Sequence, residues 1–348
     1  MSLQLGLFDD EPAPEPSGPL GPAPPLAQHI QLAERIPAKL RMGTSSWSFP
    51  GWEGIVYDRR ASQALLAKEG LGPYAHHPLL RTVGLDRTYY RPISTEQFQD
   101  YAAAVPDDFR FLVKADRLLT SPTDPGPDTL RGANPLFLDS SYAMQEVVGP
   151  MMEGLGDKAG PLLFQFSPIP PNLVGGHNAF ADRLHRFLDA LPEGLLYAVE
   201  LRTPAFLTDR YAHLLEETGA AHCYTVHPAM SSLERQLQVV RVFEQPALVV
   251  RWMLHAGLRY QVAKDRYEPF DRIVDEDADS LERIAVAALD ALVAEKGVFI
   301  VVNNKAEGSS PLSVFRLAER IAWWVPSEAT DSSRTSTPSH SPAPSRTP

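Results

Sequence analysis

Charged side chains stand at the ends of several short apolar runs of this chain. Four of them are basic: Arg91, Lys114, Arg202 and Arg251. A guanidinium fork binds two oxygens of a phosphate or carboxylate at once, so this set predicts a site for a phosphate-bearing or other small anion. Glu200 and Asp86 end two of the same runs and are candidate catalytic residues, because a carboxylate beside cations can act as a general acid or base.

Amide side chains complete this polar set. Gln165, Asn303 and Asn304 end two further runs, where they could orient a ligand or an attacking water by hydrogen bonds. The same residues also fit a second interpretation, in which Glu200 and Asp86 only neutralise the arginines in an internal ion-pair network. The sequence leaves both interpretations open.

Two tryptophans flank a Pro-Gly turn just after the first run. Trp47 and Trp52 could stack on a base or sugar ring of a ligand, since every such ring offers a face. The alternative is that both pack in the hydrophobic core, as most large aromatic residues do.

These polar residues must be positioned by the apolar runs themselves. Eight runs predict strands: LRMGTSS, RTVGLD, FRFLVK, PLLFQF, LYAVELR, AAHCYT, ALVVRW and VFIVVNN. Segments of helical period lie between most of them, and the runs are nearly continuous in apolar residues, as strands buried on both faces should be. This alternation predicts an α/β fold, a single TIM-like (β/α)8 barrel whose chemistry lies at the carboxyl ends of the strands; an open doubly wound sheet is the competing architecture.

Local signals support the helices between these strands. Ser94 is predicted to cap a helix that ends before Pro106, and Ser310 followed by Pro311 predicts the start of the last helix. The long connection of residues 254–275 follows the seventh strand and is rich in basic and tyrosine residues. We expect it over the site face.

The composition divides the chain into three parts. Residues 1–38 are rich in proline and predict a disordered tail, residues 39–326 form the barrel, and residues 327–348, rich in Ser, Thr and Pro, predict a second disordered tail. The net charge of −11 argues against a protein that binds polyanions over its whole surface. No apolar stretch is long enough to span a membrane and the acidic start does not resemble a signal peptide, so we expect a cytoplasmic protein.

No metal or cofactor motif stands out. Cys223 is the only cysteine, which excludes a disulfide framework, and the histidines show no spacing typical of a metal site. His227 and His255 follow the sixth and seventh strands and could join Glu200 and Asp86 in an irregular site. We therefore predict no cofactor, and leave a divalent metal open.

A short motif lies near the start of the chain. Residues 4–8 (QLGLF) resemble the peptide by which bacterial replication and repair proteins bind the DNA sliding clamp. In such a peptide Leu5, Leu7 and Phe8 supply apolar contacts and Gln4 polar ones, and a proline-rich tether would link it to the barrel. The alternative is an ordinary apolar start.

Seven sequence blocks occur in one order along the chain: GTSSWSFPGW, TYYRPIS, FRFLVKAD, GPLLFQFSPIP, VELRTPAF, VVRW and VVNNKAEG. This set resembles the domain-of-unknown-function-72 (YecE-like) family over residues 40–325, and the resemblance implies a TIM-like barrel of uncharacterised activity. The chain departs from the family pattern at Gly84, where a Glu is usual, at Asp86, at Thr203 and at Met253–Leu254. If those family positions are catalytic, this member is altered, although Asp86 lies on the same strand face as Gly84.

Three functional hypotheses follow. The first is a barrel that binds a phosphate-bearing ligand at its upper face, with hydrolytic or phosphodiester chemistry. The second is a DNA replication or repair accessory that residues 4–8 tether to the sliding clamp, where tethering would compensate for weak nucleic-acid binding by an acidic protein. The third is a non-catalytic barrel.

Overall fold

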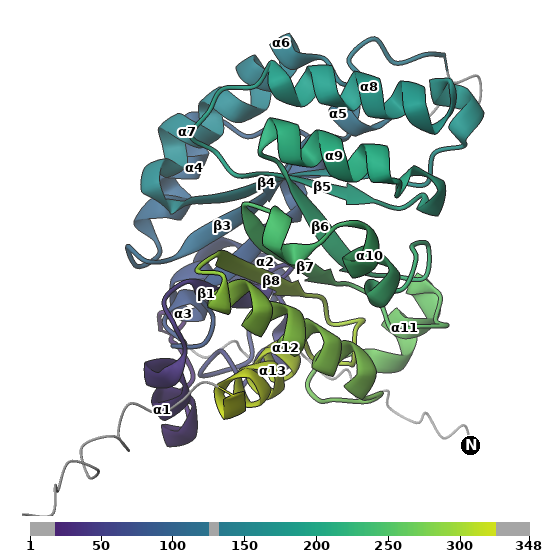
Figure 1. Ribbon diagram of the computed structural model, residues 1–348. Helices are drawn as coiled ribbons and strands as arrows, with labels where there is room; N and C mark the ends of the chain where they lie inside the picture. Colours follow the sequence, from purple (N-terminus) through teal and green to yellow (C-terminus); the bar gives the residue numbers. More distant parts are fainter. Residues whose placement is uncertain (1–17, 125–131, 325–348) are drawn as a thin grey trace, which may run out of the picture.

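Eight parallel strands close into a barrel in the computed structural model, which describes residues 18–124 and 132–324. Each strand pairs with its neighbours in sequence, and β1 pairs with β8 to close the ring (Figure 1). The strands are β1 (Leu40–Thr44), β2 (Thr82–Leu85), β3 (Arg110–Lys114), β4 (Ala159–Phe166), β5 (Tyr197–Leu201), β6 (Ala221–Val226), β7 (Ala247–Trp252) and β8 (Gly297–Val302). The predicted TIM-like barrel and its eight strands are confirmed.

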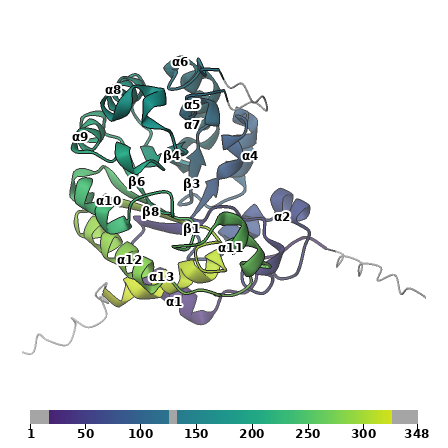
Figure 2. The same cartoon turned by 90° about the vertical axis from the view of Figure 1, so that its right-hand side faces the viewer.

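Helices surround the barrel on its outside (Figure 2). The α-helices are α1 (Ala27–Arg35), α2 (Gln63–Glu69), α3 (Leu71–Ala75), α4 (Thr95–Ala103), α5 (Arg117–Thr120), α6 (Ser140–Ala143), α7 (Gly149–Leu155), α8 (Gly176–Asp189), α9 (Asp209–Thr218), α10 (Leu233–Val239), α11 (Tyr260–Tyr267), α12 (Ala278–Val293) and α13 (Ser310–Trp324). Short turns of 3₁₀-helix are η1 (Pro50–Trp52), η2 (Asp86–Tyr89), η4 (Gly156–Lys158), η5 (Pro171–Val174), η6 (Pro204–Phe206) and η7 (Val242–Glu244), and η3 (Met144–Val148) is a π-helical turn.

Two of the predicted helix starts are confirmed. The Ser94 hydroxyl accepts a hydrogen bond from the backbone N–H of Gln97 at the start of α4, and α13 begins at Ser310 with Pro311 next. The Ser94 cap satisfies a backbone N–H that the first turn of a helix leaves without a partner.

The predicted boundary of the N-terminal tail is wrong for residues 18–38. Leu20, Ala23 and Ile36 are buried, and α1 packs against α13 at the outside of the barrel (Figure 1). The Arg35 guanidinium donates to the carbonyl oxygen of Ala322 at 2.6 Å. Burial of a few apolar side chains against the barrel offsets the ordering entropy of this proline-rich segment, which composition alone does not reveal. The rest of the predicted tails, residues 1–17 and 325–348, lies outside the described residues.

The buried apolar residues form three clusters, one of which packs Leu254, Ala263, Tyr267 and Phe270 together around α11. A large apolar layer lies between the strands and the surrounding helices. A smaller cluster fills the barrel interior; its members are Leu112, Leu163, Ala198, Ala221, Cys223, Val249 and Val301. This plug makes the barrel a packed core rather than a pore, and it supports the residues that follow on the same strand faces. Cys223 is a buried member of the plug.

Candidate anion site at the barrel mouth

A polar layer lies at the carboxyl ends of the strands, directly above the apolar plug. Successive side chains of a strand point to opposite faces, so the residue two positions beyond each plug residue also points inward. In this way Leu112 leads to Lys114, Ala198 to Glu200 and Val249 to Arg251. We call this layer the barrel mouth; its members include Asp86, Lys114, Gln165, Glu200, Arg202 and Arg251.

Arg251 is the centre of the mouth. Its Nη1 donates to Glu200 Oε2 at 2.6 Å and to Gln165 Oε1 at 3.0 Å, while its Nη2 donates to Asp86 Oδ1 at 3.1 Å and Oδ2 at 3.2 Å. The side chain is 1% exposed. Both terminal nitrogens are thus engaged by protein groups, and the guanidinium organises the mouth instead of facing a ligand.

Glu200 bridges two guanidinium groups. It is fully buried, and its Oε1 accepts a hydrogen bond from Arg202 Nε at 2.5 Å while its Oε2 is held by Arg251. Burial by itself raises the pKa of this carboxyl, but Arg202 and Arg251 outweigh burial and lower the pKa to about 2. Glu200 is therefore a carboxylate at neutral pH, and its placement suits charge balance better than proton transfer.

Asp86 is the carboxylate of the mouth that solvent reaches. It begins η2 directly after β2, and its side chain is 35% exposed even though both oxygens accept from Arg251. Arg251 fixes the carboxylate from below and leaves its outer side accessible. A general base must reach substrate, and among the two carboxylates of the mouth Asp86 meets that requirement.

Lys114 is the cation of the mouth without a carboxylate in ion-pair contact, within the part of the chain that the structure describes. Its Nζ lies 3.7 Å from the centroid of the Tyr89 ring, and the residue is 8% exposed. Burial lowers the pKa of Lys114 to about 8, and the neighbouring Arg251 contributes in the same direction while Asp86 opposes it. The ammonium remains the major form at neutral pH.

The charges of the mouth do not balance. Lys114, Arg202 and Arg251 supply three positive charges and Asp86 and Glu200 two negative ones, which leaves one positive charge in excess. Arg202 and Lys114 are both more than nine-tenths buried. Excess positive charge in a poorly solvated site attracts anions more strongly than the same charge on the surface.

His227 stands beside this layer, after β6. Its Nδ1 accepts the backbone N–H of Ala229 at 3.0 Å, so in the neutral ring the proton is on Nε2. Burial lowers the pKa of His227 to about 4, and the cations Arg202 and Arg251 lower it further than Glu200 raises it. The ring is therefore a neutral donor at physiological pH.

The two asparagines of the last strand end have different roles. Asn303 faces the mouth side, where its Nδ2 donates to Ser45 Oγ at 2.8 Å. Asn304 is buried, and its Oδ1 accepts from the backbone N–H and the hydroxyl of Ser310 at 2.8 and 2.7 Å, which caps α13. Asn304 thus positions a helix.

Three predicted ligand-binding residues lie apart from this network. Arg91, beyond η2, is exposed and makes no hydrogen bond or ion pair within the described segments. Trp47 and Trp52 are buried in the hydrophobic core, where Trp47 Nε1 donates to the carbonyl oxygen of Leu66 at 3.0 Å and Trp52 stacks near Tyr74. Both tryptophans therefore pack in the core and do not face the mouth.

At position 84, where the family usually has Glu, the neighbouring backbone leaves little room for a side chain. A Cβ added at this position would lie 3.2 Å from Ser45 Cα and 3.3 Å from Ser45 O on the neighbouring strand. A Glu at position 84 would need β1 to move by a few tenths of an ångström.

We predict that Gly84→Ala lowers the free energy of unfolding by about 1–3 kcal/mol, because an added methyl group overpacks this site. Urea denaturation measures the change. A neutral or stabilising effect would show that β1 yields freely.

The clamp-peptide residues Gln4, Leu5, Leu7 and Phe8 lie outside the described residues, so the clamp interaction stays a prediction. In the described part of the chain no group of three or more His, Cys, Asp or Glu residues has a geometry that could hold a metal ion, and no helix there is long and apolar enough to cross a membrane.

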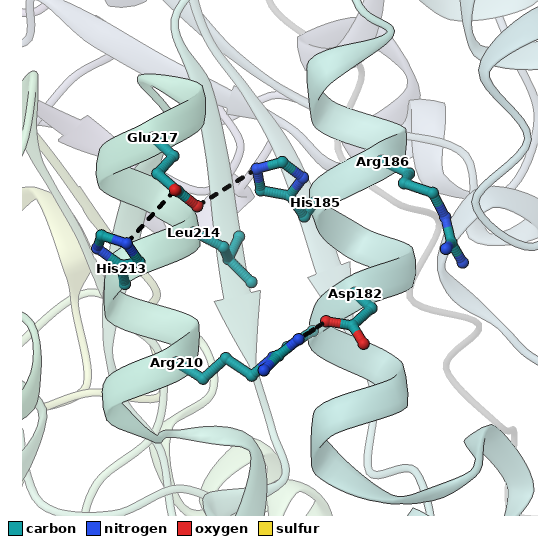
Figure 3. A pocket seen from close by; sticks show the side chains of 8 residues that line it. Asp182, His185, Arg186, Arg210, His213, Leu214 and Glu217 are labelled. Carbon is teal, nitrogen blue, oxygen red and sulfur yellow. Dashed lines mark hydrogen bonds and ion pairs between the residues drawn. The ribbon is translucent and has the colours of Figure 1, made fainter.

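A hollow also exists on the outside of the barrel, between α8 and α9 (Figure 3). It is lined by ion pairs: Arg210 with Asp182, and Glu217 with His185 and His213. These side chains are between about a third and two-thirds exposed, so they behave as a solvated face between two helices.

Sequence reasoning missed several residues of the site face. Tyr89 contacts Lys114, and Lys305 lies between Tyr260 and Phe270. Lys305 directly follows the asparagine pair in the last sequence block, and Tyr89 lies three residues beyond Asp86. Proximity to a strand end was therefore an available signal for both.

The fold and the mouth define the class: a single parallel (β/α)8 barrel with a buried charged layer at its carboxyl end. The family model described as "Protein of unknown function DUF72" matches residues 41–337, and the chain belongs to that family. The resemblance predicted from the sequence blocks is confirmed.

Solved structures share the fold. A DUF72 family protein from Thermotoga maritima is 18% identical, with a TM-score of 0.55 over 80% of this chain and 98% of that one. A DUF72 family protein from Enterococcus faecalis is also 18% identical, with a TM-score of 0.54 over 81% of this chain and 95% of that one. No curated protein matches the sequence. At these identities the likeness shows the fold alone.

Proposed function

We propose that this barrel binds a small phosphate-bearing anion at its mouth and that Lys114 is the principal cation for it. The observation that carries this proposal is the Lys114 ammonium, which is buried in a layer with excess positive charge and has no carboxylate partner among the described residues. An anion at this place would supply the missing partner, since a buried charge is costly without one.

The neighbouring groups suit the same ligand. Arg202 is paired with Glu200 on its Nε side. The Nε2–H of neutral His227 and the amide of Gln165 offer further polar contacts around the mouth. Hydrogen bonds from charged donors to phosphate oxygens are short and about twice as strong as neutral ones. We expect Arg202 to assist Lys114 and Arg251 to hold both carboxylates in place.

Binding should depend on pH through Lys114. We expect sulfate, which stays doubly charged throughout, to bind with nearly constant affinity below pH 8 and to weaken as pH rises through about 8, where the pKa of Lys114 lies in the free protein. Titration calorimetry from pH 6.5 to 9.5 measures this. Lys114→Met should lower the affinity roughly 10- to 100-fold, the loss of one charged hydrogen bond. Lys114→Arg should bind without the decline near pH 8, because a guanidinium stays charged.

Lys39→Met is the matched control. Lys39 precedes β1 at the opposite end of the barrel and forms an exposed ion pair with Glu295. Its removal should leave sulfate affinity unchanged. Equal affinity of wild type and Lys114→Met at pH 7 would contradict the proposal.

The reaction we propose for this site is phosphodiester hydrolysis. Asp86 takes a proton from water, the water oxygen attacks phosphorus, and the leaving oxygen departs with a proton from the Lys114 ammonium. A lysine whose pKa is about 8 can donate that proton near neutral pH.

Asp86→Asn should lower the turnover of a chromogenic phosphodiester at least about 100-fold, the usual contribution of a general base, while sulfate still binds. A wild-type protein that binds sulfate without turnover would overturn the hydrolysis and leave anion binding intact.

A further inference from the structure

A separate pocket of about 480 Å³ lies beside the mouth. Its lining comes from four segments that follow β1, β7 and β8: the η1 turn, the start of α2, the region of α11 and the turn after the last strand. We call it the aromatic pocket; the residues used below are Phe49, Gly51, Tyr260, Lys264, Phe270 and Lys305. It therefore opens on the face of the barrel where ligands of this fold bind.

Lys305 is the polar residue buried in this pocket. It is 6% exposed, and its Nζ lies 4.3 Å from the centroid of the Tyr260 ring and 5.8 Å from that of Phe270. Within residues 18–124 and 132–324 the only hydrogen bond of its ammonium runs to Asn303 Oδ1, at 3.4 Å, and no carboxylate there lies within ion-pair distance. Two aromatic rings and one long hydrogen bond compensate a buried ammonium only in part.

The walls of the pocket are aromatic and fixed. Phe49 packs edge-on against Phe270, with ring centroids 5.5 Å apart, and against Trp52 of the core at 5.0 Å. The backbone of Gly51 approaches Pro269 so closely that a Cβ at Gly51 would lie 1.8 Å from the Pro269 carbonyl oxygen. The η1 turn and the segment after α11 therefore hold each other in place, and the pocket is formed before any ligand arrives.

Tyr260 forms the open side. The residue is 61% exposed although its ring is large and contacts the Lys305 ammonium on one side. An exposed aromatic ring at the rim of a pocket offers a flat face on which a planar group can stack. Lys264, one turn further along α11, is already paired with Glu268, which leaves Lys305 as the cation available inside.

We propose that the aromatic pocket binds a planar aromatic ring that carries an anionic group, with the ring against Tyr260 and the anion on the Lys305 ammonium. The combination decides the ligand class: an inorganic anion would leave the aromatic face unused, and an uncharged ring would leave Lys305 without its partner. A nucleoside monophosphate and an aromatic carboxylate share this chemistry. The site is distinct from the mouth, since Lys305 and Lys114 belong to different sets of contacts.

Calorimetric titration with adenosine monophosphate and with 4-hydroxybenzoate separates the two sources. We expect one of the two to bind more tightly than adenosine, phenol or inorganic phosphate at equal concentration. Lys305→Met, which replaces the ammonium with an apolar group of similar length, and Tyr260→Ala should each lower that affinity at least tenfold. The far-ultraviolet circular dichroism spectrum checks that both variants fold.

Lys114→Met distinguishes the two sites. It should lower the sulfate affinity of the mouth roughly 10- to 100-fold and leave the affinity for the aromatic anion unchanged, whereas Lys305→Met should weaken the aromatic anion and leave sulfate unchanged. Loss of the aromatic anion in Lys114→Met but not in Lys305→Met would place that ligand at the mouth and overturn the inference. Failure of both probes to bind wild type at millimolar concentration, or equal binding by wild type and Lys305→Met, would overturn it as well.

Discussion

Arg251→Met should lower the free energy of unfolding by about 3–5 kcal/mol, the cost of breaking a buried ion-pair network by removing one partner. The guanidinium is 1% exposed and holds Glu200, Gln165 and Asp86 together. Without it Glu200, which is fully buried, keeps Arg202 as its cation but loses the bond to Oε2. Urea denaturation, analysed by linear extrapolation, measures the change.

A surface arginine supplies the matched control. Arg210 pairs with Asp182 across α8 and α9, and both side chains are about half exposed (Figure 3). Arg210→Met should change the free energy of unfolding by no more than about 1 kcal/mol, as exposed pairs do. The double variant Arg251→Met with Glu200→Gln should be less destabilised than the sum of its singles, because the second change removes the charge that the first leaves short of a partner. A cost below about 1 kcal/mol for Arg251→Met would contradict the buried network.

The strands were predictable because their signal is local. Each run is a short apolar segment between helical patterns, and eight such strands linked by helices favour the closed barrel that the structure has. The same local rule placed the site, since side chains at strand ends of a barrel meet at one face. Lys114, Glu200 and Arg251 come together because inward positions recur every second residue.

The roles within the site depend on packing, which the sequence does not encode locally. Arg91 and Arg251 look equivalent in the sequence as basic residues near strand ends, yet one is exposed and the other is buried in a network. Asn303 and Asn304 are neighbours, but the period of the backbone turns one toward Ser45 and the other toward the start of α13. Which of two similar side chains faces a ligand is decided by contacts between distant segments.

The order of the N-terminal segment also depends on contacts between distant parts of the chain. Its proline content predicts disorder, but His29 of α1 is buried against Phe315 of α13, with ring centroids 4.3 Å apart. The partner surface is nearly three hundred residues away in the chain. Composition indicates whether a segment folds alone, whereas contacts with the folded barrel order this segment.

The junction between α1 and the barrel should make the protein sensitive to mild acid. His77 is 4% exposed, and its Nδ1 accepts the backbone N–H of Leu79 at 3.3 Å. Its Nε2 therefore carries the proton, which it donates to His29 Nδ1 at 3.3 Å. Neither ring can take a second proton without placing two N–H groups against each other.

Burial, with a smaller contribution from the nearby His29, lowers the pKa of His77 to about 3. In the unfolded chain the pKa of a histidine is about 6.5, so between these two values the unfolded state binds more protons and stability falls as the pH falls. At pH 4 the expected loss from His77 is about 3 kcal/mol relative to pH 7. This contribution becomes constant well above pH 6.5, where the histidine of the unfolded chain is neutral as well.

His77→Phe isolates this contribution from that of the carboxylates. Phenylalanine can keep the stacking on Phe315, whose ring centroid lies 4.4 Å from that of His77. At pH 7 the variant should be about 1–2 kcal/mol less stable, since Leu79 N–H and His29 Nδ1 lose their partners. On acidification to pH 4 it should lose less stability than wild type, so that the two denaturation curves converge. His213→Gln, on an exposed imidazole, should keep the wild-type pH dependence. If His77→Phe and wild type lose stability in parallel between pH 7 and pH 4, His77 is not the group that titrates, and the acid sensitivity of the barrel comes from its carboxylates.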